Sequence, residues 1–151
     1  SKVKELSKAY AQRAQEAAKA FDPPTFTHPP LDASLGLTAG GPRLKVGYVS
    51  SDFCNHPLGH LMQSVFGMHD RTKLEVYCYS LRKHDTSTFR KTIELGAERF
   101  REVSHLDSLQ IAKLINADGI HVLVNLNGYT KGGRNEICAM RPCAIQMLYM
   151  G

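Results

Sequence analysis

From residue 43 onward the sequence alternates between short apolar runs and segments of helical periodicity, and this alternation limits the possible folds more than any other feature. The runs with the length and composition of strands are 44–50, 74–80, 99–103, 120–126 and 145–150. The segments with helical spacing are 57–67, 87–95, 108–117 and 134–140. Strands that alternate with helices form parallel sheets through right-handed crossovers. The pattern predicts an α/β fold, a Rossmann-like, doubly wound parallel sheet.

The run 120–126 is β-branched and almost entirely apolar, which is typical of a strand buried on both faces. In the usual doubly wound order the first and fourth strands are neighbours, and their connections leave in opposite directions. A ligand crevice then lies outside their carboxyl ends. Polar, ionisable and glycine residues concentrate after these two strands, in the segments 50–57 and 127–134. We expect the two segments to meet at the crevice.

The residues before the sheet have a different pattern. Residues 1–21 carry apolar side chains at helical spacing and predict one amphipathic helix. Residues 22–42 hold most of the prolines, which remove backbone donors and break both periodicities. These prolines are Pro23, Pro24, Pro29, Pro30 and Pro42. We expect a Pro/Gly-rich strap here, not a second core.

The composition fits a globular protein of one domain: 151 residues, 42% hydrophobic and 22% charged. No apolar stretch approaches the ~18–20 residues of a bilayer span, and the first residues do not resemble a signal peptide, so we expect an intracellular protein with no membrane partner. The net charge of +5 is scattered along the chain. Because no zinc-finger or RNA-binding signature accompanies it, we expect no nucleic-acid partner.

The four cysteines, Cys54, Cys78, Cys138 and Cys143, contain no C-x-x-C pair. Cys78 lies inside an apolar run that predicts a buried strand. Free thiols are therefore expected, and a structural zinc site is not.

The first polar segment contains two ionisable side chains suited to proton transfer. His56 has the side chain that changes charge near neutral pH, so it is a candidate general base or a donor to a negatively charged group. Asp52 is a candidate to orient His56 or to act itself. The alternative is that Asp52 caps a helix beginning at Pro57 and that His56 is a surface residue. His56 and His60 have the spacing of a metal pair, but a proline between them and the lack of a third ligand argue against a metal.

The second polar segment is rich in glycine and positive charge. Its glycines are Gly128, Gly132 and Gly133. They allow backbone amides to approach a phosphate or sugar, and Lys131 and Arg134 add charge, although an ordinary strand-to-helix turn has the same composition. Neither a dinucleotide fingerprint nor a P-loop is present. Tyr129 is a candidate to stack on a sugar or to cover the crevice, and His121 is interpreted as a hydrogen-bonded core residue.

Several unbroken runs carry a resemblance to one family. They are VGYVSSDF (46–53), NHP (55–57), HLMQS (60–64), GMH (67–69), DGIH (118–121), NLNGYTKG (125–132) and RNE (134–136). In this order they resemble the catalytic domain of the eukaryotic protein O-GlcNAc transferases, over essentially residues 43–151. The helix of residues 1–21 and the strap of 22–42 resemble the linker between that family's tetratricopeptide (TPR) repeats and its catalytic core.

The resemblance implies the N-terminal lobe of a GT-B type, inverting glycosyltransferase. Such an enzyme moves N-acetylglucosamine from UDP-GlcNAc to Ser or Thr hydroxyls of cytoplasmic and nuclear proteins, with no metal ion or other cofactor. The match covers only the first lobe of that design, and in the family most uridine diphosphate contacts come from the C-terminal lobe. We therefore expect the 151-residue chain alone to have negligible transferase activity.

The resemblance also implies roles for individual residues. His56 matches a histidine beside the reacting sugar and acceptor, and Asp52 matches an aspartate proposed for proton removal; which of the two accepts the proton stays open. The positions that match the donor or acceptor side are Asn55, Pro57, Tyr129, Thr130, Lys131, Arg134, Met150 and Gly151. Two residues depart from the family: Leu58 replaces a usual Thr, and Cys54 replaces a usual Gly.

Two other functions remain open at this point. One is the related protein O-fucosyltransferase branch, which uses GDP-fucose; the NHP and NGYT runs favour the N-acetylglucosamine type. The other is a non-catalytic, flavodoxin-like binding or scaffold module that has kept the fold.

Overall fold

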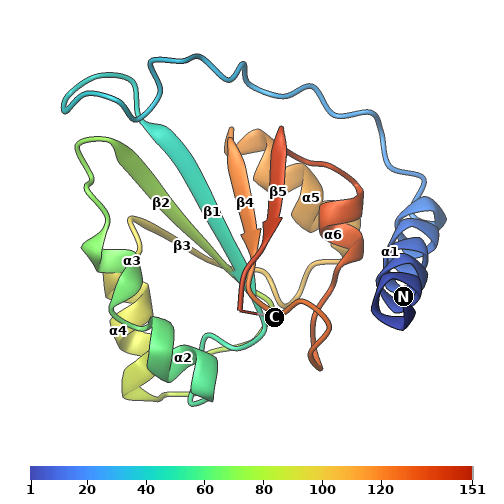
Figure 1. The fold of residues 1–151 in the computed structure, drawn as a ribbon. Coiled ribbons are helices and arrows are strands. Elements are labelled where there is room, and N and C mark those ends of the chain that lie inside the picture. The colour runs from blue at the N-terminus through green and yellow to red at the C-terminus, as the bar shows by residue number, and fades with distance from the viewer. Residues whose placement is uncertain (151) are drawn as a thin grey trace.

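The computed structural model describes residues 1–150 and confirms the predicted parallel sheet (Figure 1). Its strands are β1 (Leu44–Ser50), β2 (Leu74–Ser80), β3 (Arg99–Glu102), β4 (Val122–Asn125) and β5 (Ile145–Leu148). The sheet has five strands in the order β3-β2-β1-β4-β5, and every neighbouring pair is parallel. As predicted, β1 lies beside β4, so the sheet changes winding direction between them.

The helices lie on both faces of the sheet, as the alternation predicts (Figure 1). They are α1 (Lys2–Ala20), α2 (Pro57–Met62), α3 (Val65–Met68), α4 (Thr88–Gly96), α5 (Ser108–Ala117) and α6 (Glu136–Ala139). α2, α3 and α4 cover one face, α5 and α6 cover the other, and α1 packs beside α6. Among the described residues, no helix combines the length and hydropathy of a bilayer span.

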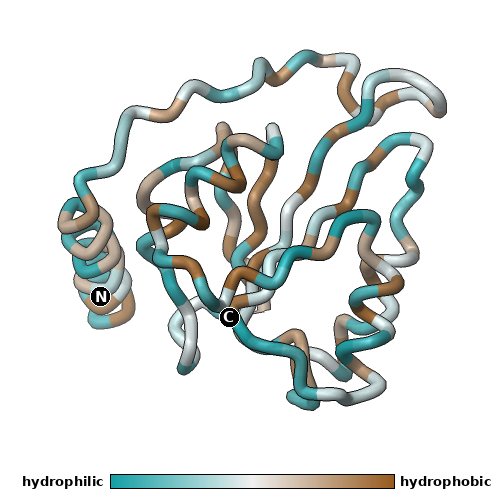
Figure 2. The backbone as a smooth tube through the Cα atoms, turned by 180° about the vertical axis from the view of Figure 1, so that it is seen from behind, coloured by the Kyte–Doolittle hydropathy of each residue, from teal (hydrophilic) through white to brown (hydrophobic). Residues whose placement is uncertain are grey.

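Two hydrophobic clusters, one on each face, form the core. Tyr48, Val76 and Val124 point toward α2, α3 and α4, whereas the alternate strand residues Tyr79 and Leu123 pack against α5. Figure 2 shows hydrophobic stretches in the strands and in the helices beside them. The two central strands are therefore buried on both faces, as their apolar sequences predict.

His121 is a hydrogen-bonded core residue, as interpreted from the sequence. It is 8% exposed, and its Nδ1 accepts a 2.9 Å hydrogen bond from the backbone N–H of Lys45. Burial, together with the Lys45 charge, lowers the pKa of His121. The imidazole therefore links the starts of β1 and β4 in its neutral form.

Several element boundaries differ from the prediction. The expected helix 57–67 is interrupted by a turn at 63–64, with Met62 and Phe66 on either side packed into the same core cluster. The helix expected over 134–140 is the short α6, and Arg141 follows it with a left-handed φ of 54°. β5 stops at Leu148 because Met150 has a φ of 62°, which ends the extended backbone. β4 is also shorter at both ends than the run 120–126.

Residues 22–42 contain no helix or strand and pass as a strap over the amino ends of the strands, from α1 to β1 (Figure 1). Hydrogen bonds fix the strap to the body: Asn116 Nδ2 donates to Thr27 O at 2.9 Å, and His28 Nε2 lies 2.7 Å from Arg141 O. Phe26 adds an apolar contact to the cluster between α1, α5 and α6. The strap therefore leaves the carboxyl ends of the strands open.

Candidate functional site

The two polar segments meet at the carboxyl ends of β1 and β4, at the lower edge of the sheet in Figure 1. A cavity of about 190 Å³ lies between them. Its lining residues are Asp52, His56, Pro57, Leu58, Leu61, Leu126, Thr130 and Met150. The structure thus brings together five of the residues singled out from the sequence: Asp52, His56, Pro57, Thr130 and Met150.

Asp52 is a buried carboxylate, 4% exposed, at the end of β1. Its Oδ2 accepts from Asn127 Nδ2 at 3.0 Å, and its Oδ1 accepts from Ser51 Oγ at 3.2 Å. The alternative that Asp52 caps the following helix is wrong. The cap of α2 is His56, whose Nδ1 accepts a 3.1 Å hydrogen bond from the N–H of Leu58.

His56 lies beside Asp52, with 3.9 Å between its Nδ1 and Asp52 Oδ2. Its side chain is 44% exposed and therefore accessible from the cavity. Because Nδ1 accepts the N–H of Leu58, hydrogen bonding assigns the proton of the neutral imidazole to Nε2. In this geometry His56 offers a donor at Nε2, and Asp52 is the neighbouring acceptor.

Asn127 joins the two polar segments, and it was not among the site residues predicted from the sequence. It is 1% exposed; its Oδ1 accepts from the Ser51 N–H at 2.6 Å, and its Nδ2 donates to Ser51 Oγ at 2.8 Å. The same Nδ2 lies 3.0 Å from Asp52 Oδ2 and 3.1 Å from Thr130 Oγ1. The available signal was its position directly after a buried strand, at the carboxyl end where ligands bind.

Gly132 allows the second segment to approach β1 closely. It has a φ of 87°, and a Cβ atom built on it would lie 2.6 Å from Ser51 Oγ. Glycine is therefore required at this position both for conformation and for space.

Other residues singled out from the sequence point away from this cavity. Asn55 Oδ1 pairs with His60 Nε2 at 2.7 Å on the surface. Tyr129 stacks on Tyr10 of α1 with 4.5 Å between ring centroids, and both rings line a separate cavity of about 200 Å³. Tyr129 therefore covers the α1 side of the loop in this structure.

The two cations of the second segment have different surroundings. Arg134 Nε donates to Ser108 Oγ at 3.0 Å, and its NH1 donates to Leu106 O at 3.1 Å, so its guanidinium anchors the segment to the start of α5. The Lys131 side chain is exposed, and its backbone oxygen accepts from Ser51 Oγ at 3.4 Å. Lys131 is thus the more accessible charge near the cavity, and Gly151 lies outside the described residues.

The two departures from the family lie within or beneath the site. Leu58 is 6% exposed and contributes an apolar wall to the cavity. Cys54 is 2% exposed in the first segment, and burial raises the pKa of its thiol. All four cysteines are free, and within residues 1–150 no group of three or more His, Cys, Asp or Glu side chains is arranged to hold a metal ion.

Comparison with known proteins gives consistent matches. The profile of glycosyl transferase family 41 matches residues 4–151. The chain is 52% identical, over 97% of its length, to a probable UDP-N-acetylglucosamine--peptide N-acetylglucosaminyltransferase SEC of Arabidopsis thaliana. It is 48% identical, over 82% of its length, to the UDP-N-acetylglucosamine--peptide N-acetylglucosaminyltransferase of Caenorhabditis elegans.

The chain spans only 15% of the Arabidopsis protein and 11% of the nematode protein. The structure of a mutant O-GlcNAc transferase from Thermobaculum terrenum superimposes on it with a TM-score of 0.72 at 29% identity. That match covers 95% of this chain and 27% of the bacterial chain.

Proposed function

Because this chain belongs to glycosyl transferase family 41, we propose that it forms the N-terminal catalytic lobe of an inverting, GT-B type protein O-GlcNAc transferase. The complete enzyme would transfer N-acetylglucosamine from UDP-GlcNAc to Ser or Thr hydroxyls of proteins. The observation that carries the proposal is the meeting of Asp52, His56 and Thr130 at one cavity, at the carboxyl ends of β1 and β4. The names of the Arabidopsis and nematode relatives, both UDP-N-acetylglucosamine--peptide N-acetylglucosaminyltransferases, support the same donor and reaction.

Transfer to a hydroxyl requires an acceptor for its proton, and departure of a diphosphate requires donors or positive charge. The Asp52 carboxylate is the acceptor that this lobe offers, since His56 Nδ1 is occupied by the N–H of Leu58. His56 would donate from Nε2 to an oxygen of the reacting groups and hold them in place.

The other site residues have supporting roles in the proposal. Pro57, Thr130 and Met150 line the cavity that would hold the sugar and the acceptor, and exposed Lys131 would add charge near the diphosphate. Asn55, Tyr129, Arg134 and Gly151 complete the substrate-side set proposed from the family. The reaction is assigned no metal and no cofactor besides the donor substrate.

A second, C-terminal lobe would provide the remaining donor contacts, which agrees with the small share of each relative that the chain covers. We also propose that residues 1–21 are a linker helix after a TPR region, that 22–42 are a strap, and that 43–151 are the lobe itself. The complete protein would act in cytoplasm and nucleus on protein acceptors, without nucleic-acid or membrane partners.

The experiment measures sugar transfer to a Ser/Thr peptide by a two-lobed transferase that contains this chain. We expect transfer from UDP-GlcNAc and not from GDP-fucose, and His56→Ala should lower turnover on the order of 10²-fold or more. His56→Gln places an amide donor near the Nε2 position and should retain more turnover than His56→Asn, which places its amide near Nδ1. Unchanged turnover in His56→Ala would sink the assignment.

Two controls separate the alternatives. Transfer from GDP-fucose in direct competition would identify the fucosyltransferase branch instead. The isolated 151-residue chain should show negligible turnover, and adding a second lobe in trans should restore donor binding. If the second lobe restores neither donor binding nor transfer, the scaffold interpretation replaces the proposal.

A further inference from the structure

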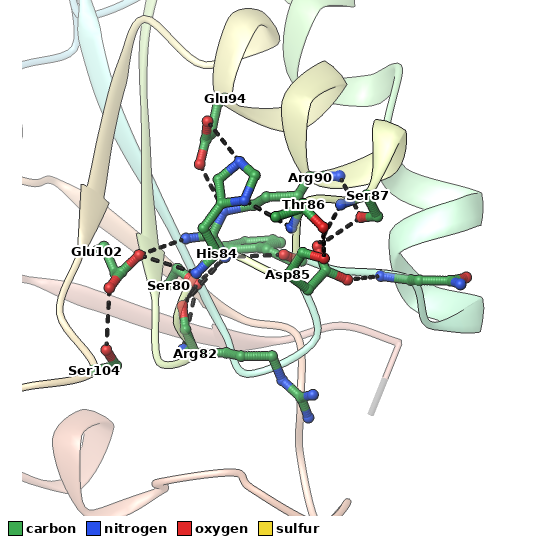
Figure 3. Close-up of polar contacts among 12 residues, drawn as sticks. Ser80, Arg82, His84, Asp85, Thr86, Ser87, Arg90, Glu94, Glu102 and Ser104 are labelled. Carbon is green, nitrogen blue, oxygen red and sulfur yellow. Dashed lines mark hydrogen bonds and ion pairs between the residues drawn. The ribbon is translucent and has the colours of Figure 1, made fainter.

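Arg90 of α4 is a fully buried charge, 0% exposed, whose guanidinium reaches the loop that carries Asp52 and His56 (Figure 3). Its NH1 donates to the backbone oxygen of Phe53 at 3.0 Å and to Ser80 Oγ at 2.8 Å. Its other nitrogens donate to carboxylates: Nε donates to Glu94 at 2.8 Å, and NH2 donates to Glu102 at 3.2 Å. Burial of a guanidinium is tolerated only when its donors are paired, and here they are.

The segment between β2 and α4 holds the same loop at two further points. Arg82 Nε donates to the backbone oxygen of Ser51 at 2.8 Å. Asp85 Oδ2 accepts from the backbone N–H of Asn55 at 2.7 Å. The loop is therefore bound through its main chain at three alternate positions, 51, 53 and 55.

The segment that provides these bonds is itself fixed. Asp85 Oδ1 accepts from the Ser87 N–H at 3.1 Å and from Ser87 Oγ at 2.7 Å, and Ser87 Oγ caps α4 by accepting from the Arg90 N–H. Burial raises the pKa of Asp85, but the hydrogen bonds from Asn55 and Ser87 outweigh it and lower the pKa to about 2. Arg90 NH1 also donates to Arg82 O at 3.2 Å, which ties two of the three holding residues together.

Asp52, which lies between two of the bound positions, lines the site cavity. Asp52 reaches Asn127 and the cavity, and His56 lies at the cavity mouth beyond the last bound position. A displacement of the main chain at residue 53 would thus move Asp52 directly. Errors of about 1 Å in catalytic groups can reduce rates about 10²-fold.

We propose that Arg90, Arg82 and Asp85 form a loop clamp that sets the position of Asp52 and His56, and that Arg90 is a positioning residue for glycosyl transfer. This inference rests on the proposed function. The clamp acts through backbone atoms of the loop and makes no contact with substrate. Its loss should therefore lower kcat and leave donor binding almost unchanged.

The test compares Arg90→Met, Arg90→Lys and Asp85→Ala with Lys91→Met, an exposed control on the same helix. In the two-lobed transferase, rates are divided by the fraction of enzyme that binds UDP in calorimetry. We expect Arg90→Met to lower kcat about 10- to 100-fold with the KM for UDP-GlcNAc within about twofold. Arg90→Lys should not restore kcat, because one ammonium cannot replace the guanidinium fork. Lys91→Met should leave both constants unchanged.

A merely structural role would reduce the amount of folded enzyme and leave kcat per UDP-binding molecule at the wild-type value, which would overturn the inference. Where Arg90→Met does not fold, Asp85→Ala and Arg82→Gln carry the test, because both residues lie near the surface. Their kcat should fall by about threefold or more.

NMR of the 151-residue chain provides a readout that does not depend on activity. Asp85→Ala should shift the backbone amides of residues 52–56 and the imidazole signals of His56, and Lys91→Met should not. If wild-type enzyme transfers no sugar, the proposed function fails while these shifts still test the clamp. Unchanged loop and imidazole signals in Asp85→Ala and Arg82→Gln overturn the clamp itself.

Discussion

Replacement of Asn127 by alanine tests whether one buried amide holds the two site segments together. Its side chain makes hydrogen bonds of 2.6 Å to Ser51 N, 2.8 Å to Ser51 Oγ, 3.0 Å to Asp52 Oδ2 and 3.1 Å to Thr130 Oγ1. Each contributes about 0.5–1.5 kcal/mol net, and the stranded Ser51 N–H costs about 1–3 kcal/mol. Because these contributions are not additive, we expect a loss of about 3–4 kcal/mol in the free energy of unfolding.

Thermal unfolding followed by circular dichroism measures this loss. For a domain of this size, 1 kcal/mol corresponds to about 2–4 °C, so Asn127→Ala should lower Tm by roughly 6–16 °C. Urea unfolding should show a lower midpoint with an unchanged slope, since the folded core remains. A Tm within about 2 °C of wild type would refute the assigned role, because a buried site that loses these bonds cannot be neutral.

Asn127→Asp gives a second test, in which the stability of the variant depends on pH. Its carboxylate can still accept from Ser51 N–H, but its other oxygen faces Asp52 Oδ2 at the position of the present 3.0 Å bond. Two adjacent carboxylates cannot both ionise easily, so the pair titrates with one raised pKa. The folded state then holds more protons than the unfolded state, and stability rises as pH falls from neutral toward about pH 5. A pH trend identical to that of wild type would contradict this geometry.

Three further predictions concern pH dependence and backbone fit. Asp85→Asn should flatten the loss of Tm on acidification, because the wild-type carboxylate stabilises the fold above its ordinary pKa of 3.8 and loses this contribution as pH falls through about 2. Burial and the Lys45 charge lower the pKa of His121 in the folded state, so the Tm of the wild type should fall as pH drops below 6.5. His121→Asn keeps an acceptor for the Lys45 N–H but has no group that titrates in this range. Its Tm should therefore fall less than that of the wild type over the same pH range. Gly132→Ala should cost about 1–3 kcal/mol in urea unfolding, because its φ is 87° and the added Cβ meets Ser51 Oγ.

The sequence pattern predicted some elements to the residue. The bounds of β1, β2 and α5 agree with 44–50, 74–80 and 108–117, because clear local signals end these elements. For α5 the signals are a capping box between Asp107 and Gln110 and a left-handed Gly119 after the helix. The predicted bounds were less accurate for elements that depend on tertiary packing. Examples are the interrupted helix that begins at Pro57 and the short α6.

The position of the candidate site followed from strand order, whereas its supporting contacts did not. Asp52 and His56 could be placed because β1 and β4 are neighbours with open carboxyl ends. The buried state of Arg90 carries no local signal, since arginine is usually exposed and its partners other than Glu94 lie outside α4. The charge of Arg134 likewise could not reveal that Ser108 and Leu106 accept hydrogen bonds from its guanidinium.

The hydrogen-bond partners of the Asp52 carboxylate bear directly on its proposed role. A buried carboxylate is commonly paired with a cation, but within residues 1–150 Asp52 has no Lys or Arg at ion-pair distance. His56 Nδ1 lies 3.9 Å away, and the hydrogen bonds of Asp52 come from Asn127 and Ser51. An amide and a hydroxyl orient the carboxylate without neutralising its charge. Arg90, the buried cation that binds the backbone oxygen of the neighbouring Phe53, is instead paired with Glu94 and Glu102. The fold therefore uses its buried guanidinium on the loop's main chain and leaves the Asp52 carboxylate without a Lys or Arg partner, as its proposed role of proton acceptor requires.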